Sequence, residues 1–475
     1  MSKRFLLFVL LSFSLSLLCT PAVVHAQWGP DTLLVPNGWY AQTSFNNARC
    51  IASGVGGILH VVWMDRRDGN AEIYYKRSSD QGINWSPDLR LTNNPDSSKF
   101  PAVAAAGDDV HIVWIDHRSN TYSIYYKRSS DQGISWSPEV RLSDNTANSS
   151  LPTVWSAGPE VHSVWEDWRG SKTQVYYKHS SDGGTTWSSN SSLTSDTLNN
   201  VSPSVSSSGS NVHVVWSKRS SVINPGWVYY MHSTDHGTTW TQGIHLPDDT
   251  TRTDNPSIWA SGSSVHAVWT NWSSYEIYFK RSTDQGSTWS PDARLTYDPS
   301  VSENPSVVVS GSNVHVVWDD WRDGSGNYEI YYKCSTDGGG LWTPDTRLTY
   351  DPNWSYCPSF TCSDSMLHVV WTDIRSNYVP KIYYKRNPTG NSGVEELSSS
   401  HLPPYASRFT VSPNPFTSFA TLPGHGREFF ALYDISGRRV GVYRGDRIGE
   451  GLSPGVYFLK LDGKVAKPFR VVKFR

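Results

Sequence analysis

The sequence predicts an all-β fold, a seven-bladed β-propeller, on three observations. A His-(Val/Ile/Ser/Ala)-Val-Trp pattern returns about 51 residues apart, a period typical of propeller repeats. Every copy is made of short runs rich in Val, Ile, Tyr and Trp, bounded by turn residues. No copy shows sustained helical periodicity. The pattern ends at Trp63, Trp114, Trp165, Trp216, Trp269, Trp318 and Trp371.

The second copy shows how each repeat predicts one blade. Its first strand lies within 101–107, and its second ends at Trp114. A third strand is expected over 123–128 and a fourth near 139–142. Four antiparallel strands are the content of one propeller blade.

The closure of the ring is predicted from the N-terminal segment. Only six copies carry their own fourth strand, and residues 28–35 resemble residues 85–92 in pattern. We expect this segment to pair with Lys381–Arg386 and to complete blade seven. Such pairing removes the two sheet edges that an open ring would expose.

The loop between the third and fourth strands carries the best-defined motif of the chain. It reads Ser-Ser-Asp80-Gln-Gly82-Ile-Asn-Trp85 in the first copy. Asp can accept backbone N–H groups within a turn, and Gly can adopt a positive φ. Because every copy has the motif, we expect a structural role. Its aspartates are Asp80, Asp131, Asp182, Asp235, Asp284 and Asp337.

This motif resembles the Asp-box of bacterial neuraminidase (sialidase-like) repeat proteins, and the resemblance covers nearly all of residues 27–386. It implies a propeller and, as one hypothesis, a sialidase-like exo-glycoside hydrolase. Three departures stand against that hypothesis. The neuraminidase fold has six blades, its Arg-Ile-Pro motif is replaced by Arg49-Cys50-Ile51, and no nucleophilic Tyr with a partner Glu can be assigned from sequence. The main top-face glutamates are Glu72, Glu166, Glu276, Glu303 and Glu329.

Both ends of the chain predict export. Residues 1–26 have the charged start, apolar core and small-residue cleavage site of a secretory signal peptide. Residues 387–407 are rich in Ser, Pro, Gly and Asn and are expected to be a linker after the propeller of 27–386. Residues 408–475 resemble the C-terminal sorting domain of type IX secretion substrates. That resemblance implies the type IX export machinery as a partner and an extracellular or cell-surface location.

Composition and cysteine spacing argue against several classes of partner and ligand. A formal net charge of −2 without basic clusters argues against nucleic acid. No run after the signal peptide is long and apolar enough to span a membrane. The cysteine spacing is not that of a zinc site, and we expect neither a metal nor a cofactor. Cys50 and Cys357 both begin first strands of neighbouring blades, so we expect a disulfide between them.

The alternating direction of successive strands in a blade identifies the candidate binding face. The loops from strand two to three, and from strand four to the next blade, lie on one face, which we call the top face. Six of the 22 tryptophans fall in its loops, either as a ligand platform or packed against neighbouring loops. They are Trp39, Trp168, Trp227, Trp272, Trp321 and Trp354.

Two further patterns occupy the same part of the chain. An Asp-x-Arg pair follows the second strand in five blades, and this repetition favours structural ion pairs over a catalytic arginine cluster. Blade four has Lys218-Arg219 instead, and blade five has Asn271-Trp272, which makes these blades the first place to search for a single site. The in-phase histidines, one per blade, are expected in the core.

Two functions follow from the sequence. The favoured one is a secreted or cell-surface module that binds a glycan or a surface protein through Trp39, Trp168, Trp272, Trp321, Trp354, Lys218 and Arg219. The alternative is the sialidase-like hydrolase. The uniformity of the loops favours binding, because an enzyme concentrates unlike residues at one point.

Overall fold

The structure, a computed structural model, describes residues 28–390 apart from 46–47, 119–120, 145, 222–225, 325, 364–365, 376 and 389. It also describes 429–433, 439–444, 447–448, 450–461 and 469–473. The predicted signal peptide, most of the predicted linker and much of the predicted sorting domain therefore lie outside the described residues.

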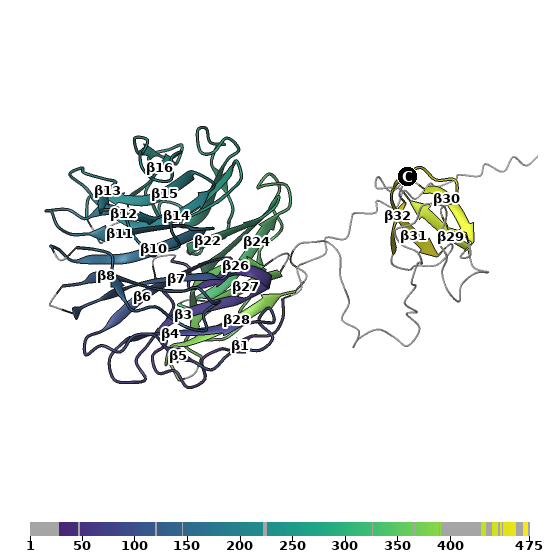
Figure 1. Ribbon diagram of the computed structural model, residues 1–475. Helices are drawn as coiled ribbons and strands as arrows, with labels where there is room; N and C mark the ends of the chain where they lie inside the picture. Colours follow the sequence, from purple (N-terminus) through teal and green to yellow (C-terminus); the bar gives the residue numbers. More distant parts are fainter. Residues whose placement is uncertain are drawn as a thin grey trace, which may run out of the picture. The chain divides into compact units, whose positions relative to one another are not determined.

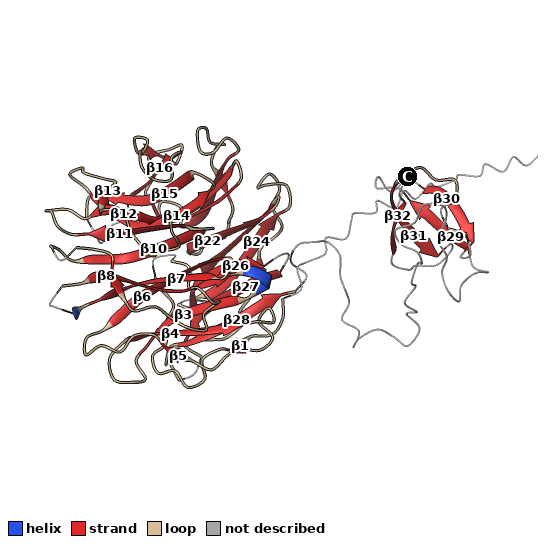
Figure 2. Ribbon diagram, viewed as in Figure 1, coloured by secondary structure: helices blue, strands red, loops and turns tan. Residues whose placement is uncertain are grey.

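The seven-bladed propeller is confirmed. Seven antiparallel four-stranded sheets follow one another along the chain, and strands dominate the unit, with a short 3-10 turn at Val55–Gly57 (Figures 1 and 2). Blade one comprises β2 (Ile51–Ser53), β3 (Leu59–Asp65), β4 (Glu72–Ser78) and β5 (Leu89–Arg90). Blade two comprises β6 (Ser98–Ala106), β7 (Asp109–Asp116), β8 (Ser123–Ser129) and β9 (Val140–Arg141). Blade three comprises β10 (Ser149–Ala157), β11 (Glu160–Asp167), β12 (Gln174–Ser180) and β13 (Ser191–Ser192).

The remaining blades repeat this order. Blade four comprises β14 (Asn199–Ser208), β15 (Asn211–Arg219), β16 (Trp227–Ser233) and β17 (Ile244–His245). Blade five comprises β18 (Thr253–Ser261), β19 (Ser264–Asn271), β20 (Glu276–Ser282) and β21 (Ala293–Arg294). Blade six comprises β22 (Ser302–Ser310), β23 (Asn313–Asp320), β24 (Glu329–Ser335) and β25 (Thr346–Arg347). Blade seven comprises β26 (Ser355–Ser363), β27 (Met366–Asp373), β28 (Lys381–Asn387) and the N-terminal β1 (Thr32–Leu33).

Blade seven closes the ring as the sequence predicts. β1 pairs antiparallel with β28, with Thr32 opposite Tyr384, and the purple β1 lies beside the green β28 in Figure 1. The Trp28 ring packs edge-on against Tyr332 of blade six, with ring centroids 5.2 Å apart. The two ends of the propeller are therefore held by the same contacts that join internal blades.

Neighbouring blades are joined through a repeated aromatic contact. In blade one, His60 Nδ1 and Tyr75 Oη lie 2.7 Å apart, and the Tyr75 ring meets Trp136 of blade two edge-on at 4.9 Å. Gly133 of the blade-two Asp-box packs against the same phenol, which leaves no room there for a side chain. The core histidines are buried, with a tyrosine partner in six blades, whereas in blade five the Phe279 ring stacks against His266 with centroids 5.8 Å apart. The six paired histidines are His60, His111, His162, His213, His315 and His368.

Each Asp-box aspartate organises its own loop. In blade two, Asp131 accepts the backbone N–H groups of Ile134 and Ser135 and the hydroxyl of Ser129. A hydrogen bond from the Ser135 hydroxyl contributes most, and together these hydrogen bonds lower the pKa of Asp131 to about 2, because they stabilise its ionised form. The geometry fits the structural role expected for the motif.

The C-terminal unit is described by itself. Four strands, β29 (Phe429–Tyr433), β30 (Arg439–Arg444), β31 (Gly455–Leu461) and β32 (Phe469–Lys473), form a sheet in the order β30-β29-β31-β32. Phe430, Ala431 and Leu432 of its central strand β29 are buried.

The expected disulfide is absent. Cys50 and Cys357 are both free thiols. The Cys50 thiol instead faces the Pro101 carbonyl of blade two at 3.5 Å and accepts the Ser44 N–H at 3.2 Å. Burial raises the pKa of Cys50 to about 11, which keeps this thiol protonated. The prediction was wrong because strand position alone does not fix where a side chain points.

Candidate functional site

Exposed side chains divide sharply between the faces of the propeller. All nine exposed aromatic side chains among its described residues lie in top-face segments. The exposed aliphatic side chains, such as Ile83, Ile134 and Leu341, lie in Asp-box loops, outer strands or the turn at Val55. The nine aromatic residues are Trp39, Tyr40, Phe45, Trp168, Tyr275, Tyr297, Tyr350, Trp354 and Tyr378.

Two of these exposed rings, Phe45 and Trp354, join four partly buried aromatic side chains in a continuous row, which we call the aromatic arc. It consists of Phe100, Phe45, Tyr356, Trp354, Tyr328 and Trp321, in spatial order. Successive ring centroids are 6.2, 6.2, 6.4, 5.6 and 4.5 Å apart. Phe45 and Trp354 are about half exposed, so the arc is accessible from solvent.

The arc is assembled from distant parts of the chain. Phe100 belongs to β6 of blade two, and Phe45 to the segment that joins β1 to blade one. Tyr356 lies in β26 of blade seven, and Tyr328 in the β23–β24 loop of blade six. Ring closure brings blade seven beside blade one and thereby completes the row.

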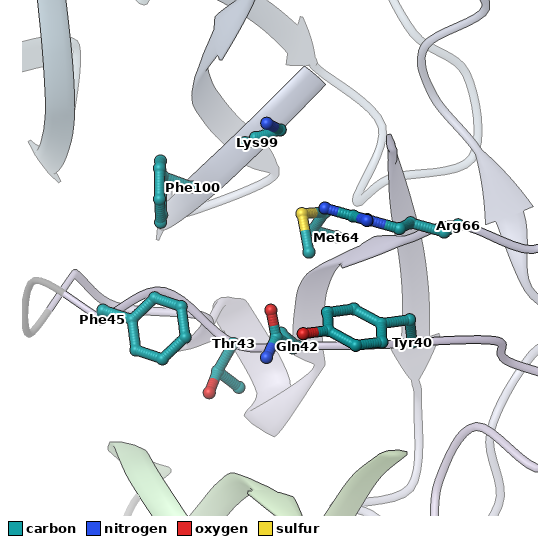
Figure 3. A pocket seen from close by; sticks show the side chains of 8 residues that line it. All are labelled: Tyr40, Gln42, Thr43, Phe45, Met64, Arg66, Lys99 and Phe100. Atoms are coloured by element: carbon teal, nitrogen blue, oxygen red, sulfur yellow. The ribbon is translucent and has the colours of Figure 1, made fainter. Parts of the chain in front are cut away.

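One end of the arc borders a hollow of about 250 Å³. Phe45 and Phe100 lie on one side of it, and Tyr40 with Arg66 on the other (Figure 3). The Arg66 guanidinium stands 4.9 Å from the centre of the Tyr40 ring. The remaining lining residues are Gln42, Thr43, Met64 and Lys99.

The other end of the arc carries carboxyl groups. Tyr328 Oη donates to Glu303 Oε1 at 2.6 Å, and Asn304 donates to Asp319 Oδ2 at 2.9 Å. Burial raises the pKa of Glu303, and burial together with the nearby Glu303 raises that of Asp319 well above its usual range. The Asp319 Oδ1 atom is buried without a hydrogen-bond partner. This end of the arc therefore carries two carboxyl groups whose burial favours the neutral form.

The structure brings together two of the tryptophans that the sequence singled out. Trp321 and Trp354 both contact Tyr328 and belong to the arc. Trp272 packs against Tyr275 in blade five, and Trp168 is exposed in blade three. Trp39 is exposed, and its backbone N–H donates to Asp65.

Trp227 is partly buried in β16 and donates to the Thr250 carbonyl. The six tryptophans therefore do not form one cluster.

The cationic residues of blade four are held in ion pairs. Lys218 pairs with Asp196 at 2.7 Å, and Arg219 pairs with Asp254 at 2.5 Å. Glu166 lies in the same region and accepts from Ser202 and Ser150, and burial raises its pKa. The break in repeat symmetry in blade four thus corresponds to a partly buried set of ion pairs and hydrogen bonds.

The five Asp-x-Arg pairs are ion pairs within the loops. Arg322, for example, bridges Asp320 and Asp345 at 2.6 and 2.7 Å and covers the Tyr331 ring. Repetition of this arrangement in blades one, two, three and seven fits a structural role. The pairs do not converge on a single point.

Arg49 contacts the inner strands of blades three, four and five. Its side chain is partly buried, and its guanidinium stacks 4.4 Å from Trp155 and 4.9 Å from Trp259. It donates to the carbonyls of Val205 and Ile258 at 3.3 and 2.7 Å. Because first strands surround the propeller axis, a blade-one residue that touches those of blades three, four and five must cross that axis.

Sequence reasoning missed Tyr40, Phe45, Tyr328, Tyr356 and Phe100 as site residues. Their signal was present, since each is an aromatic residue in a top-face segment that departs from the repeat pattern. The analysis of tryptophan alone did not detect it. Within the described ranges, no group of three or more His, Cys, Asp or Glu could hold a metal ion.

No protein-family model and no curated protein match the sequence. The fold is similar to that of the Hadza microbial sialidase Hz136, with 14% identity and a TM-score of 0.45 over 71% of this chain. This chain spans 64% of the length of that sialidase. A protein of unknown function from Dyadobacter fermentans is 13% identical, with a TM-score of 0.49 over 76% of this chain and 98% of its own.

The phage phi92 endosialidase is 10% identical, with a TM-score of 0.49 over 94% of this chain and 87% of its own. These likenesses concern the fold alone. Among the described residues, no helix is long and apolar enough to cross a membrane.

Proposed function

We propose that this protein is an exported glycan-binding propeller that holds its ligand on the aromatic arc. The observation that carries the proposal is the confinement of exposed aromatic rings to the top face, while aliphatic side chains occupy the other surfaces. Flat rings offer the faces on which sugar rings stack. Exposed aromatic clusters are typical of interaction surfaces.

The polar groups around the arc suit hydroxyl-rich ligands. Gln42 donates to Tyr356 Oη and Glu303 accepts from Tyr328 Oη, so an amide and a carboxyl group lie beside its rings. A carbohydrate site combines apolar ring contacts with a few placed polar groups. A protein partner is the other occupant to be tested.

The direct test is a glycan-array assay on the purified protein. We expect the wild type to retain glycans and Trp354→Ala to bind them about tenfold or more weakly. A nucleic-acid base stacked on an aromatic side chain contributes about 1–3 kcal/mol, and we expect a stacked sugar ring to contribute a similar free energy. The matched control is Leu341→Ala, an exposed side chain in an Asp-box loop. Equal loss in both variants, or no retention by the wild type, would contradict the proposal.

Hydrolysis is the second candidate, and one observation favours it. Tyr328 and Glu303 form the kind of Tyr–Glu pair that the resemblance to sialidases requires, at 2.6 Å. Burial and the adjacent Glu303 raise the pKa of Tyr328, so its phenol is neutral and a base would have to remove its proton before it could attack. A fluorogenic sialoside assay tests this candidate, with Tyr328→Phe as the variant that abolishes turnover.

Export by the type IX route is part of the proposal. Its support is the set of sequence motifs in residues 1–26 and 408–475. In a host that carries this machinery, deletion of residues 408–475 should leave the propeller in the periplasm. Undiminished export of the truncated chain would exclude a sorting role.

A further inference from the structure

The hollow at the blade-one end of the arc is cationic. Arg66 and Lys99 both line it, together with the rings of Tyr40, Phe45 and Phe100 (Figure 3). None of its eight lining residues carries a carboxylate. The hollow therefore presents positive charge beside apolar ring surfaces.

These two cations differ from their neighbours in sequence and space. Arg67, next to Arg66, pairs with Asp65 and Asp88, and Lys76 in β4 pairs with Asp88. Across the described part of the chain, Arg66 and Lys99 have no such carboxylate within ion-pair distance. The Arg66 side chain is exposed, and Lys99 is partly exposed. Uncompensated charge at a hollow favours an anionic ligand group, most strongly as a charge-assisted hydrogen bond.

The arc also sets the length of the ligand. Its six rings follow one another from blade two, past the N-terminal segment and blade seven, to blade six. A single sugar covers only one or two such rings. The remaining rings are used only if the ligand extends over several sugar residues.

We infer that the ligand is an extended acidic polysaccharide, with an anionic group bound by Arg66 and Lys99 in the hollow and neutral ring faces along the arc. This inference rests on the proposed function. The anionic group can be a carboxylate or a sulfate, since both match the two cations.

The test measures retention of the purified protein on immobilised polysaccharides. The probes are polygalacturonate, its fully methyl-esterified form, chondroitin sulfate and dextran. We expect retention on polygalacturonate or chondroitin sulfate, or on both, and at least about tenfold weaker retention on the two neutral polymers. Retention on polygalacturonate shows that a carboxylate is sufficient, whereas retention on chondroitin sulfate alone, which carries carboxylates as well as sulfates, shows that a sulfate is required. Added salt should weaken acidic retention, because the contact is charge-assisted and exposed.

Charge variants assign the effect to the hollow. Arg66→Gln and Lys99→Gln should each reduce acidic retention by about tenfold. The matched control is Arg141→Gln, an exposed arginine on the outer strand β9. Near-UV circular dichroism confirms that the variants are folded. An equal loss in Arg141→Gln, or no loss in either hollow variant, overturns the inference.

A length series tests the extended binding mode. Oligomers of the retained polysaccharide, from monomer to octamer, should bind more tightly as they lengthen, and Trp354→Ala should flatten that dependence. Equal affinity for the monomer and the octamer overturns the inference but leaves the proposed function intact. Equal retention of neutral and acidic polymers has the same meaning. Retention of none of them, together with a silent glycan array, overturns both.

Discussion

Arg49 is the residue that departs most clearly from the symmetry of the ring. The other six blades have a proline at the equivalent position, namely Pro101, Pro152, Pro203, Pro256, Pro305 and Pro358. Arg49 instead spans the axis between Trp155 and Trp259. Burial lowers its pKa to about 9, so the charge is held at a cost that ring stacking and two carbonyl acceptors offset.

We predict that Arg49→Ala destabilises the propeller by about 2–4 kcal/mol, because it leaves a cavity and two buried carbonyls without a donor. Urea unfolding measures the free energy of unfolding. The control, Arg66→Ala, removes an exposed guanidinium and should change it by less than about 0.5 kcal/mol. An equal effect of the two substitutions would exclude a central role for Arg49 in stability.

The buried histidines give a prediction about protonation. Burial lowers the pKa of His60, His111 and His162 to about 3 and that of His266 to about 4. In the unfolded chain the pKa of histidine is about 6.5. The contribution of the buried neutral imidazoles to the free energy of unfolding is therefore fully present above that pH. It is lost as the pH falls towards 3, because the unfolded chain then binds protons that the folded chain excludes.

Long-range nitrogen–proton NMR tests this directly. At pH 5 we expect seven imidazoles to remain neutral in the folded protein, whereas those of the urea-unfolded chain are protonated. Ordinary titration of these seven resonances between pH 7 and pH 5 would show that the imidazoles are hydrated.

At the scale of the element, the Asp-box glycines are set by the neighbouring blade. Gly133 has a φ of 80°, and a side chain there would collide with Tyr75 Oη of blade one. Gly107 also has a positive φ, 62°, but nothing lies within 4 Å of the position of its missing Cβ. Substitution of Gly107 therefore adds backbone strain alone, whereas substitution of Gly133 adds both backbone strain and a steric clash.

We predict that Gly133→Ala costs at least about 3 kcal/mol, as overpacking adds to left-handed strain, whereas Gly107→Ala costs about 1–2 kcal/mol. Chemical denaturation of the two variants measures the difference. Equal costs would mean that the blade interface does not depend on this close contact.

The elements also show what could be predicted from sequence. The repeat period and the Trp-ending strands predict the blades, because each blade is specified by local patterning. The arc is not local: Phe45 meets Tyr356 only after the ring closes. Lys218 and Arg219 depart from the repeat, which made them candidate site residues. In the structure they form ion pairs with Asp196 and Asp254, which come from other strands and loops, so the sequence pattern did not predict these partners.

At the scale of the whole molecule, stability depends on closure. The contact of Trp28 with Tyr332 is equivalent to that of Trp136 with Tyr75. Of these two tryptophans, only Trp28 lies in the N-terminal segment whose strand β1 completes blade seven. We predict that Trp28→Ala and Trp136→Ala cost similar energies, about 3 kcal/mol. Amide hydrogen exchange should then increase in β1 and β28 only for Trp28→Ala. The same local exchange pattern in both variants would argue against closure by β1.

The central claim is that the aromatic arc of the top face binds glycan. Hydrogen exchange of the protein with and without a retained glycan tests it most directly. We expect protection in the backbone around residues 40–45, 321–328 and 353–357, with the Asp-box loops unchanged. Protection confined to the Asp-box loops or the outer strands would contradict the claim.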